Sequence, residues 1–236
     1  MKTPASRGFT LLELLVVIGL IGAMSFFLVS GLTGGGATAA LQSGQATLAN
    51  LITAARTKAP ATGRKTRLLI NADPASPDRY LRYIAFQLAR QAGSSPTDWD
   101  TVTTVTLPEG IYVMPSSLTQ AAGLVDTPAN WKRVSDQSAD LVSDLFANQS
   151  LSASLEGDGA AQTWTGISFT ANGTLAALSG STPPKGFLVI TLGTRKPPGS
   201  YLTGDAPVQL VNPQAVRGLV LSAYGVPALL NERSAF

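Results

Sequence analysis

Two hydrophobic patterns follow each other in the first quarter of the chain. Residues 14–32 form an apolar run with no charged side chain, long enough to cross a bilayer as a helix. From residue 37 to residue 58, apolar residues recur at helical spacing and predict an amphipathic helix. Its apolar face comprises Leu41, Leu48, Leu51, Ile52 and Ala55, and Gln42, Gln45, Asn50 and Thr53 are predicted to point away. We therefore predict one long N-terminal helix, with its first half in a membrane and its second half on a globular head.

Two features predict irregularities in this helix. Gly34, Gly35 and Gly36 each cost roughly 1 kcal/mol relative to alanine in a helix, so we expect the helix to loosen or bend there. Pro60 is expected to end the helix, because the residue before a proline is biased away from helical geometry.

The rest of the chain reads as short strands separated by turns. Residues 64–71 and 79–88 are expected to form a hairpin, and Asn172-Gly173 is a tight-turn signal between strands at 164–170 and 174–178. Further strands are predicted at 101–107, 111–114, 187–192, 208–211 and 218–224. Residues 116–160 interrupt this rhythm, and we interpret them as an insertion with a short helix over 135–148. The predicted fold class is α+β, with a long helix packed against antiparallel β-sheet.

The composition excludes much enzyme chemistry. The 236 residues include no histidine and no cysteine. A disulfide framework, a thiolate nucleophile, a zinc–thiolate site, a Ser-His-Asp triad and a histidine metal site are therefore excluded. We expect a protein that is not an enzyme and that needs no cofactor.

Charge is distributed unevenly. Residues 14–55 carry none, residues 56–90 carry eight basic against two acidic side chains, and residues 91–185 carry nine acidic against three basic ones. Five basic residues of the segment 56–90 could form one positive surface, with Tyr80 and Tyr83 nearby, that binds the phosphate groups of DNA. A solvated edge, or contact with the acidic segment of the same or a neighbouring subunit, is the alternative. The basic residues concerned are Arg64, Lys65, Arg67, Arg79 and Arg82.

Three acidic residues recur at helical spacing in the acidic segment. Asp136, Asp140 and Asp144 stand at i, i+4 and i+8, which places them on one face of the helix predicted there. A solvated helix face is our preferred interpretation. A calcium site is the alternative, because Ca²⁺ is bound by several carboxylate oxygens.

A single acid, Glu13, interrupts what would otherwise be one apolar stretch from Phe9 to Leu32. A carboxylate near the hydrocarbon of a membrane is costly and indicates a functional site. Lys2 and Arg7 precede the span, which favours a cytoplasmic N-terminus and a head on the other side. The segment 37–39 (ATA) is similar to a signal-peptidase site, so a cleaved signal peptide is a competing interpretation.

The segment RGFTLLELLVVI, residues 7–18, resembles the processing site of type IV prepilins and type II secretion pseudopilins. The resemblance implies cleavage between Gly8 and Phe9 by prepilin peptidase on the cytoplasmic side, followed by methylation of the new Phe9 amine. Glu13 would be an assembly residue: its carboxylate would neutralise the Phe9 amine of a neighbouring subunit, and the pair would fix the axial register.

The resemblance extends into the head. The segments 48–58, LPEGIYV, ISFTANGTL and VNPQAVRGLVLSAYG are similar to those of H-type minor pseudopilins and FimT-like minor pilins. This implies a leader at 1–8, a transmembrane helix at 9–33, a hinge and head-packed helix at 34–60, and a β-rich extracytoplasmic head at 61–236. The implied function is a structural minor subunit of a type II secretion pseudopilus or type IV pilus-like fibre, anchored in the inner membrane. Its partners would be other pilin or pseudopilin subunits and the inner-membrane assembly machinery. A DNA-binding minor pilin and a plain signal-anchored protein are the alternatives.

Overall fold

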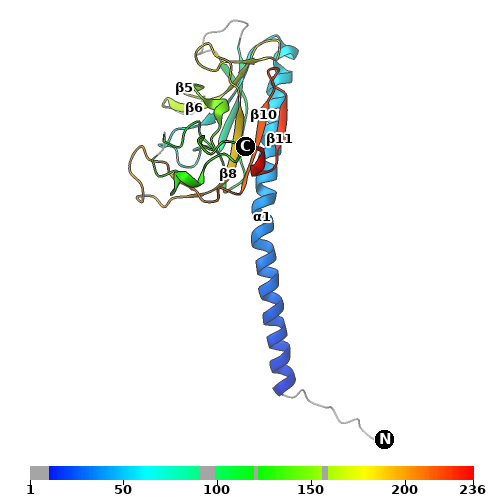
Figure 1. Cartoon of the computed structure of the whole chain (residues 1–236). Coiled ribbons are helices and arrows are strands. Elements are labelled where there is room, and N and C mark those ends of the chain that lie inside the picture. Colours follow the sequence, from blue (N-terminus) through cyan, green and yellow to red (C-terminus); the bar gives the residue numbers. More distant parts are fainter. Residues whose placement is uncertain (1–10, 91–98, 120–121, 156–158) are drawn as a thin grey trace, which may run out of the picture. The chain divides into compact units, whose positions relative to one another are not determined.

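A computed structural model describes residues 11–90, 99–119, 122–155 and 159–236, with side chains from residue 36 onward. Helix α1 spans Leu11–Thr62 (Figure 1). Backbone contacts divide the chain into two compact units, residues 1–39 and residues 40–236. The second unit, which we call the head, contains the last part of α1 and all the described strands.

Helix α1 continues through the three glycines at which we expect it to loosen or bend. The backbone stays α-helical through Gly34–Gly36, so the predicted loosening is wrong, and the bend stays a prediction. Glycine lowers helix stability, but once a helix is nucleated each added residue contributes another hydrogen bond, and the helix propagates across this cost.

The end of α1 is set by Gly63 rather than by Pro60, which lies inside the helix. Gly63 adopts φ +64°, its N–H donates to the Pro60 carbonyl at 3.3 Å, and the Arg64 N–H donates to the Ala59 carbonyl at 3.2 Å. This pair of hydrogen bonds is a Schellman motif. The prediction that Pro60 ends the helix is therefore wrong, because one missing N–H near the C-terminus removes only one intrahelical bond.

The head contains two antiparallel sheets. The first has the order β3-β2-β1-β6-β5, with β7 paired to β6, and the second has the order β11-β10-β8-β4, with β9 paired to β8. The first sheet consists of β1 (Thr66–Asn71), β2 (Tyr83–Ala89), β3 (Trp99–Thr106), β5 (Ser150–Ala153), β6 (Gln162–Phe169) and β7 (Leu175–Ala176). The second consists of β4 (Ile111–Val113), β8 (Phe187–Arg195), β9 (Val208–Leu210), β10 (Val216–Leu221) and β11 (Pro227–Leu230).

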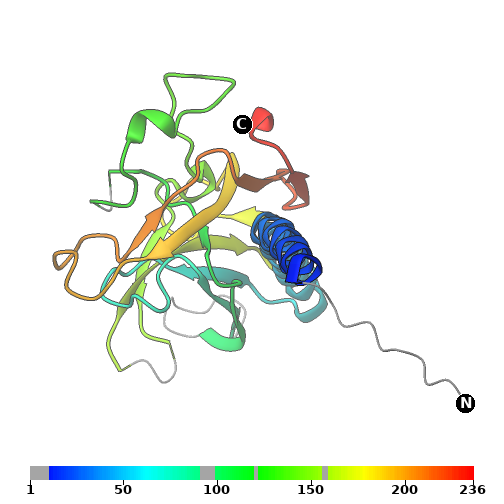
Figure 2. The same cartoon turned by 90° about the horizontal axis from the view of Figure 1, so that it is seen from below.

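The main hydrophobic core lies where both sheets meet the last part of α1. Leu48 and Ile52 of the helix pack in one cluster with Leu68 of β1, Ile190 of β8 and Leu219 of β10. Figure 2, viewed from below, shows the strands of both sheets gathered in the head. Burial of this shared apolar surface is the main force that joins helix and sheets. The helix with antiparallel sheets agrees with the predicted α+β class.

Local signals predicted several elements correctly. Strands β1 and β2 pair as the expected hairpin, and β6 and β7 pair around Gly173, which has φ +76°. Strands β5 and β11 have no counterpart among the predicted strands, and residues 79–82, predicted as strand, form turns.

Residues 135–148 contain no α-helix, so that prediction is wrong. The segment consists of turns, an isolated bridge between Lys132 and Asp140, and a single 3₁₀ turn, η2 (Asp144–Phe146). The preceding 3₁₀ turn, η1, spans Pro128–Asn130, and a third, η3 (Arg233–Ala235), ends the chain. Side chains from this region, including Trp131 and Leu141, pack with Val189 of β8 in a second hydrophobic cluster. The region therefore covers part of the second sheet.

Candidate functional site

The candidate processing site lies at the N-terminus of the chain. Glu13 is the third residue of α1 in the described backbone. Gly8 and Phe9 lie outside the described residues, as do the side chains of residues 11–35, which include Glu13 and most of the predicted span. Within the part of the chain that the structure describes, no helix combines the length and apolar character needed to cross a membrane.

Within the head, a buried amide joins α1 to strands β10 and β11. Gln45 is only 2% exposed, and its Nε2 donates to the carbonyl of Gly218 at 2.8 Å and to that of Leu230 at 3.0 Å. Its Oε1 accepts a hydrogen bond from Arg217 at 3.4 Å. The prediction that Gln45 points away from the core is wrong. A signal was present, because Gln45 follows Leu41 by four residues and precedes Leu48 by three, which places it on the apolar face.

Two further polar contacts fix the helix to both sheets. The Thr66 hydroxyl of β1 donates to the Ala55 carbonyl at 2.8 Å in a buried setting. The Arg56 Nε donates to the Tyr224 carbonyl, in the turn between β10 and β11, at 2.8 Å. Figure 1 shows this hairpin alongside the head part of α1. These contacts give the helix a defined position on the head, which apolar contacts alone specify weakly.

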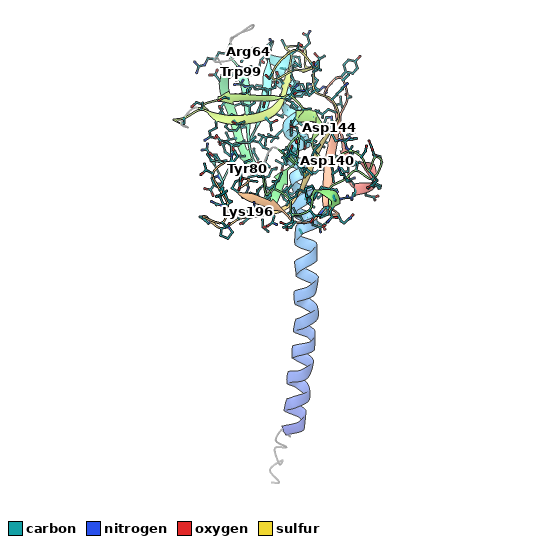
Figure 3. All side chains as sticks on the ribbon, turned by 60° about the vertical axis from the view of Figure 1, so that its left-hand side comes forward. Arg64, Tyr80, Trp99, Asp140, Asp144 and Lys196 are labelled. Atoms are coloured by element: carbon teal, nitrogen blue, oxygen red, sulfur yellow. The ribbon has the colours of Figure 1, made fainter. Side chains whose placement is uncertain are left out.

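The five basic residues proposed as a DNA surface do not share one exposed face. Lys65 is exposed and Arg64 is half-buried, and both precede β1, whereas Arg79 and Arg82 lie in the turn at the other end of the β1–β2 hairpin. In Figure 3, Arg64 lies at the top of the head and Tyr80, which follows Arg79 in this turn, lies well below it. The predicted single patch is therefore wrong.

Arg67 is buried between the two ends of the hairpin. It is 5% exposed, its Nε donates to Gln87 at 2.8 Å, and its guanidinium lies 4.1 Å from the centre of the Trp99 ring. Burial lowers the pKa of Arg67 to about 10. A side chain in this position stabilises the outer face of the first sheet and does not present its charge to a phosphate backbone.

Arg79 and Arg82 also have partners within the protein. The Arg79 guanidinium lies 4.7 Å from the centre of the Tyr83 ring, and Arg82 donates to the Leu107 carbonyl at 2.8 Å. The adjacent Tyr80 is 3% exposed, and burial raises its pKa to about 12. The predicted aromatic neighbours are therefore present, but Tyr80 is buried in the fold and Tyr83 is half-buried.

The three candidate calcium ligands have separate partners. Asp140 pairs with Lys132 at 2.6 Å, and Asp144 pairs with Arg133. Asp136 accepts a hydrogen bond from the Ser138 hydroxyl at 2.6 Å, which lowers the pKa of that carboxyl. Among the described residues no group of three or more metal-ligating side chains is present. Without the helix predicted at 135–148, the common face for calcium does not form.

Comparison with known proteins identifies the N-terminal segment. Residues 3–29 match the prokaryotic N-terminal methylation motif. No match was found among curated proteins or among solved structures. The motif match supports the type IV pilin and pseudopilin family and a pilin-like subunit. The matched segment includes Gly8, Phe9 and Glu13, the predicted processing and assembly residues.

Proposed function

We propose that this chain is a structural, non-enzymatic minor subunit of a type II secretion pseudopilus or a type IV pilus-like fibre. The single observation that carries the proposal is the match of residues 3–29 to the N-terminal methylation motif. An α-helix that begins at Leu11 and continues into a β-rich head supports it further.

In this proposal, prepilin peptidase cuts between Gly8 and Phe9 and the new amine is methylated. The helix anchors the subunit in the inner membrane, with the head outside the cytoplasm. During assembly the Phe9 ammonium enters an apolar helix bundle, where an unpaired charge is costly. The Glu13 carboxylate of a neighbouring subunit compensates that charge, so only the correct axial position is stable.

The head offers apolar surface beside the helix for contacts with other subunits. Tyr224, Val226 and Leu229 of the β10–β11 hairpin are 69%, 47% and 52% exposed. The hairpin is held to α1 by the bond from Arg56 to the Tyr224 carbonyl. A subunit that packs along α1 would therefore also cover these side chains.

Intact-mass analysis of the protein extracted from membranes tests the processing step. We expect loss of residues 1–8 and addition of one methyl group. A full-length N-terminus, or a cut near Ala39, would contradict the proposal and favour an ordinary anchor or signal peptide.

Substitution of Glu13 tests the assembly step. Glu13→Ala is expected to be processed and to stay in the membrane, but to be lost from sheared or crosslinked fibres. Glu109→Ala, which removes an exposed acid of the head, serves as the matched control. Normal incorporation of Glu13→Ala would refute the role in register.

A further inference from the structure

A cavity of about 390 Å³ lies in the head, away from the processing motif. Four chain segments meet at it: the loop between β1 and β2, residues 115–116 after β4, residues 146–150 around the start of β5, and β6. Its volume is within the range of small-molecule sites in proteins. The apolar part of its wall includes Pro74, Tyr80, Leu81, Pro115 and Phe146. We call it the Tyr80 cavity.

Backbone strain is concentrated at this cavity. Among the described non-glycine residues, only Leu81 (φ 55°) and Asn148 (φ 58°) adopt left-handed geometry, and both line the cavity. Leu81 is held there by hydrogen bonds of 2.8 Å from its N–H to Asn71 and from the Val113 N–H to its carbonyl. Such geometry is unfavourable for a bulky residue and is concentrated at functional sites.

The cavity wall presents neutral hydrogen-bonding side chains. Tyr80 is 3% exposed and its hydroxyl has no hydrogen-bond partner among the described residues, while burial keeps its pKa near 12 so that it remains a donor. The Asn148 side chain is likewise without a partner in the described part of the chain. Ser150 and Thr163 add hydroxyl groups.

Two features of the wall restrict the ligand. Among the described residues that line the cavity, none is a lysine, arginine, aspartate or glutamate, so none of them compensates the charge of a phosphate, a carboxylate or an ammonium group. The backbone N–H groups of Leu81 and Thr163 already donate within the protein, which leaves little main chain for an extended peptide to pair with. The wall therefore combines hydroxyl and amide side chains with proline and aromatic rings. Such a wall is complementary to a ligand that carries hydroxyl groups on a ring with an apolar face.

We propose that the Tyr80 cavity binds a neutral sugar ring, either as a free saccharide or as one residue of a glycan. Hydroxyls of the sugar would bond to Tyr80, Asn148 and Ser150, and its C–H face would pack on the prolines and Phe146. This inference does not depend on the role proposed for the N-terminal motif.

Saturation-transfer NMR on the full chain tests the proposal, with glucose, galactose and N-acetylglucosamine as probes. The protein is kept in a polyoxyethylene detergent, because the sugar head groups of alkyl glycoside detergents would compete with the probes for the cavity. We expect at least one probe to bind, and glucose 6-phosphate to bind more weakly than glucose. The proposal is overturned if none of the three sugars binds. It is also overturned if glucose 6-phosphate binds more strongly than glucose, or if trialanine, a short peptide probe, binds more strongly than the sugars.

Two variants assign the binding to this cavity. Tyr80→Phe removes only the hydroxyl, and Asn148→Gly removes the amide while glycine accepts the left-handed geometry, so both are expected to fold. Each should weaken sugar binding about five-fold, the effect of one lost hydrogen bond. Tyr224→Phe, which alters an exposed tyrosine outside the cavity, should leave binding unchanged. Equal binding by all three variants would place the sugar elsewhere and overturn the proposal.

Discussion

The buried amide of Gln45 allows a quantitative test of how much the hydrogen bonds between α1 and the second sheet stabilise the head. Gln45→Met keeps the length and nearly the volume of the side chain but removes its N–H donors. The carbonyls of Gly218 and Leu230 then lose a partner that lies at 2.8 Å and 3.0 Å. Loss of these two hydrogen bonds, one buried and one partly buried, costs about 2–3 kcal/mol. For a domain of this size, that destabilisation corresponds to a melting temperature lower by about 4–12 °C.

Thermal unfolding of the full chain, followed by tryptophan fluorescence, measures this effect. Trp131 and Trp164 are 3% and 0% exposed, so both report loss of packing in the head. The matched control is Gln42→Met, the same chemical change at an exposed position one turn away on the same helix. If Gln45→Met melts within about 1 °C of Gln42→Met, the amide does not stabilise the head to the extent expected from two buried hydrogen bonds.

Two further predictions concern other parts of the head. Burial raises the pKa of Tyr80 from 10.0 to about 12, so its contribution to stability is complete below pH 10 and is lost as the pH rises through 12. Melting temperatures between pH 9 and 12 should therefore fall less steeply for Tyr80→Phe than for the parent, and parallel curves would contradict this. Gly173→Ala should destabilise the β6–β7 turn by about 1–2 kcal/mol, because φ is +76° and the new Cβ would lie 2.9 Å from the Arg56 carbonyl. Urea unfolding measures this change against Gly180→Ala, a left-handed glycine with open space around it.

Local periodicity explains the correct part of the fold prediction. Leu41, Leu48, Ile52 and Ala55 share a helix face, and all four are buried as predicted. The Asn172-Gly173 turn is equally local, because only the backbone of these residues decides it. Such features depend on neighbours a few positions away, and the sequence shows those neighbours directly.

The predicted DNA surface and the calcium site do not form, because side chains that belong to them have partners that the local sequence pattern does not show. Arg67 alternates correctly with the core residues of β1, but Trp99 covers it from β3, so its charge is buried. Asp144 has the spacing of a helix face, yet its partner is Arg133 and its backbone forms a 3₁₀ turn. Composition and spacing do not show that Trp99 of β3 covers Arg67 or that Arg133 pairs with Asp144, and these contacts decide the two cases.

Directional hydrogen bonds between α1 and the sheets, which apolar packing does not supply, are made by Gln45, Thr66 and Arg56. Leu41, Leu48, Ile52 and Ala55 recur every three, four or seven residues, so a shift by one turn would replace one apolar contact with another. The hydrogen bond from the Gln45 side chain to the Gly218 carbonyl has no equivalent four residues away, where Leu41 and Ala49 stand, so a shift by one turn would leave a buried polar group unpaired. This bond therefore defines the axial position of the second sheet on the head part of α1.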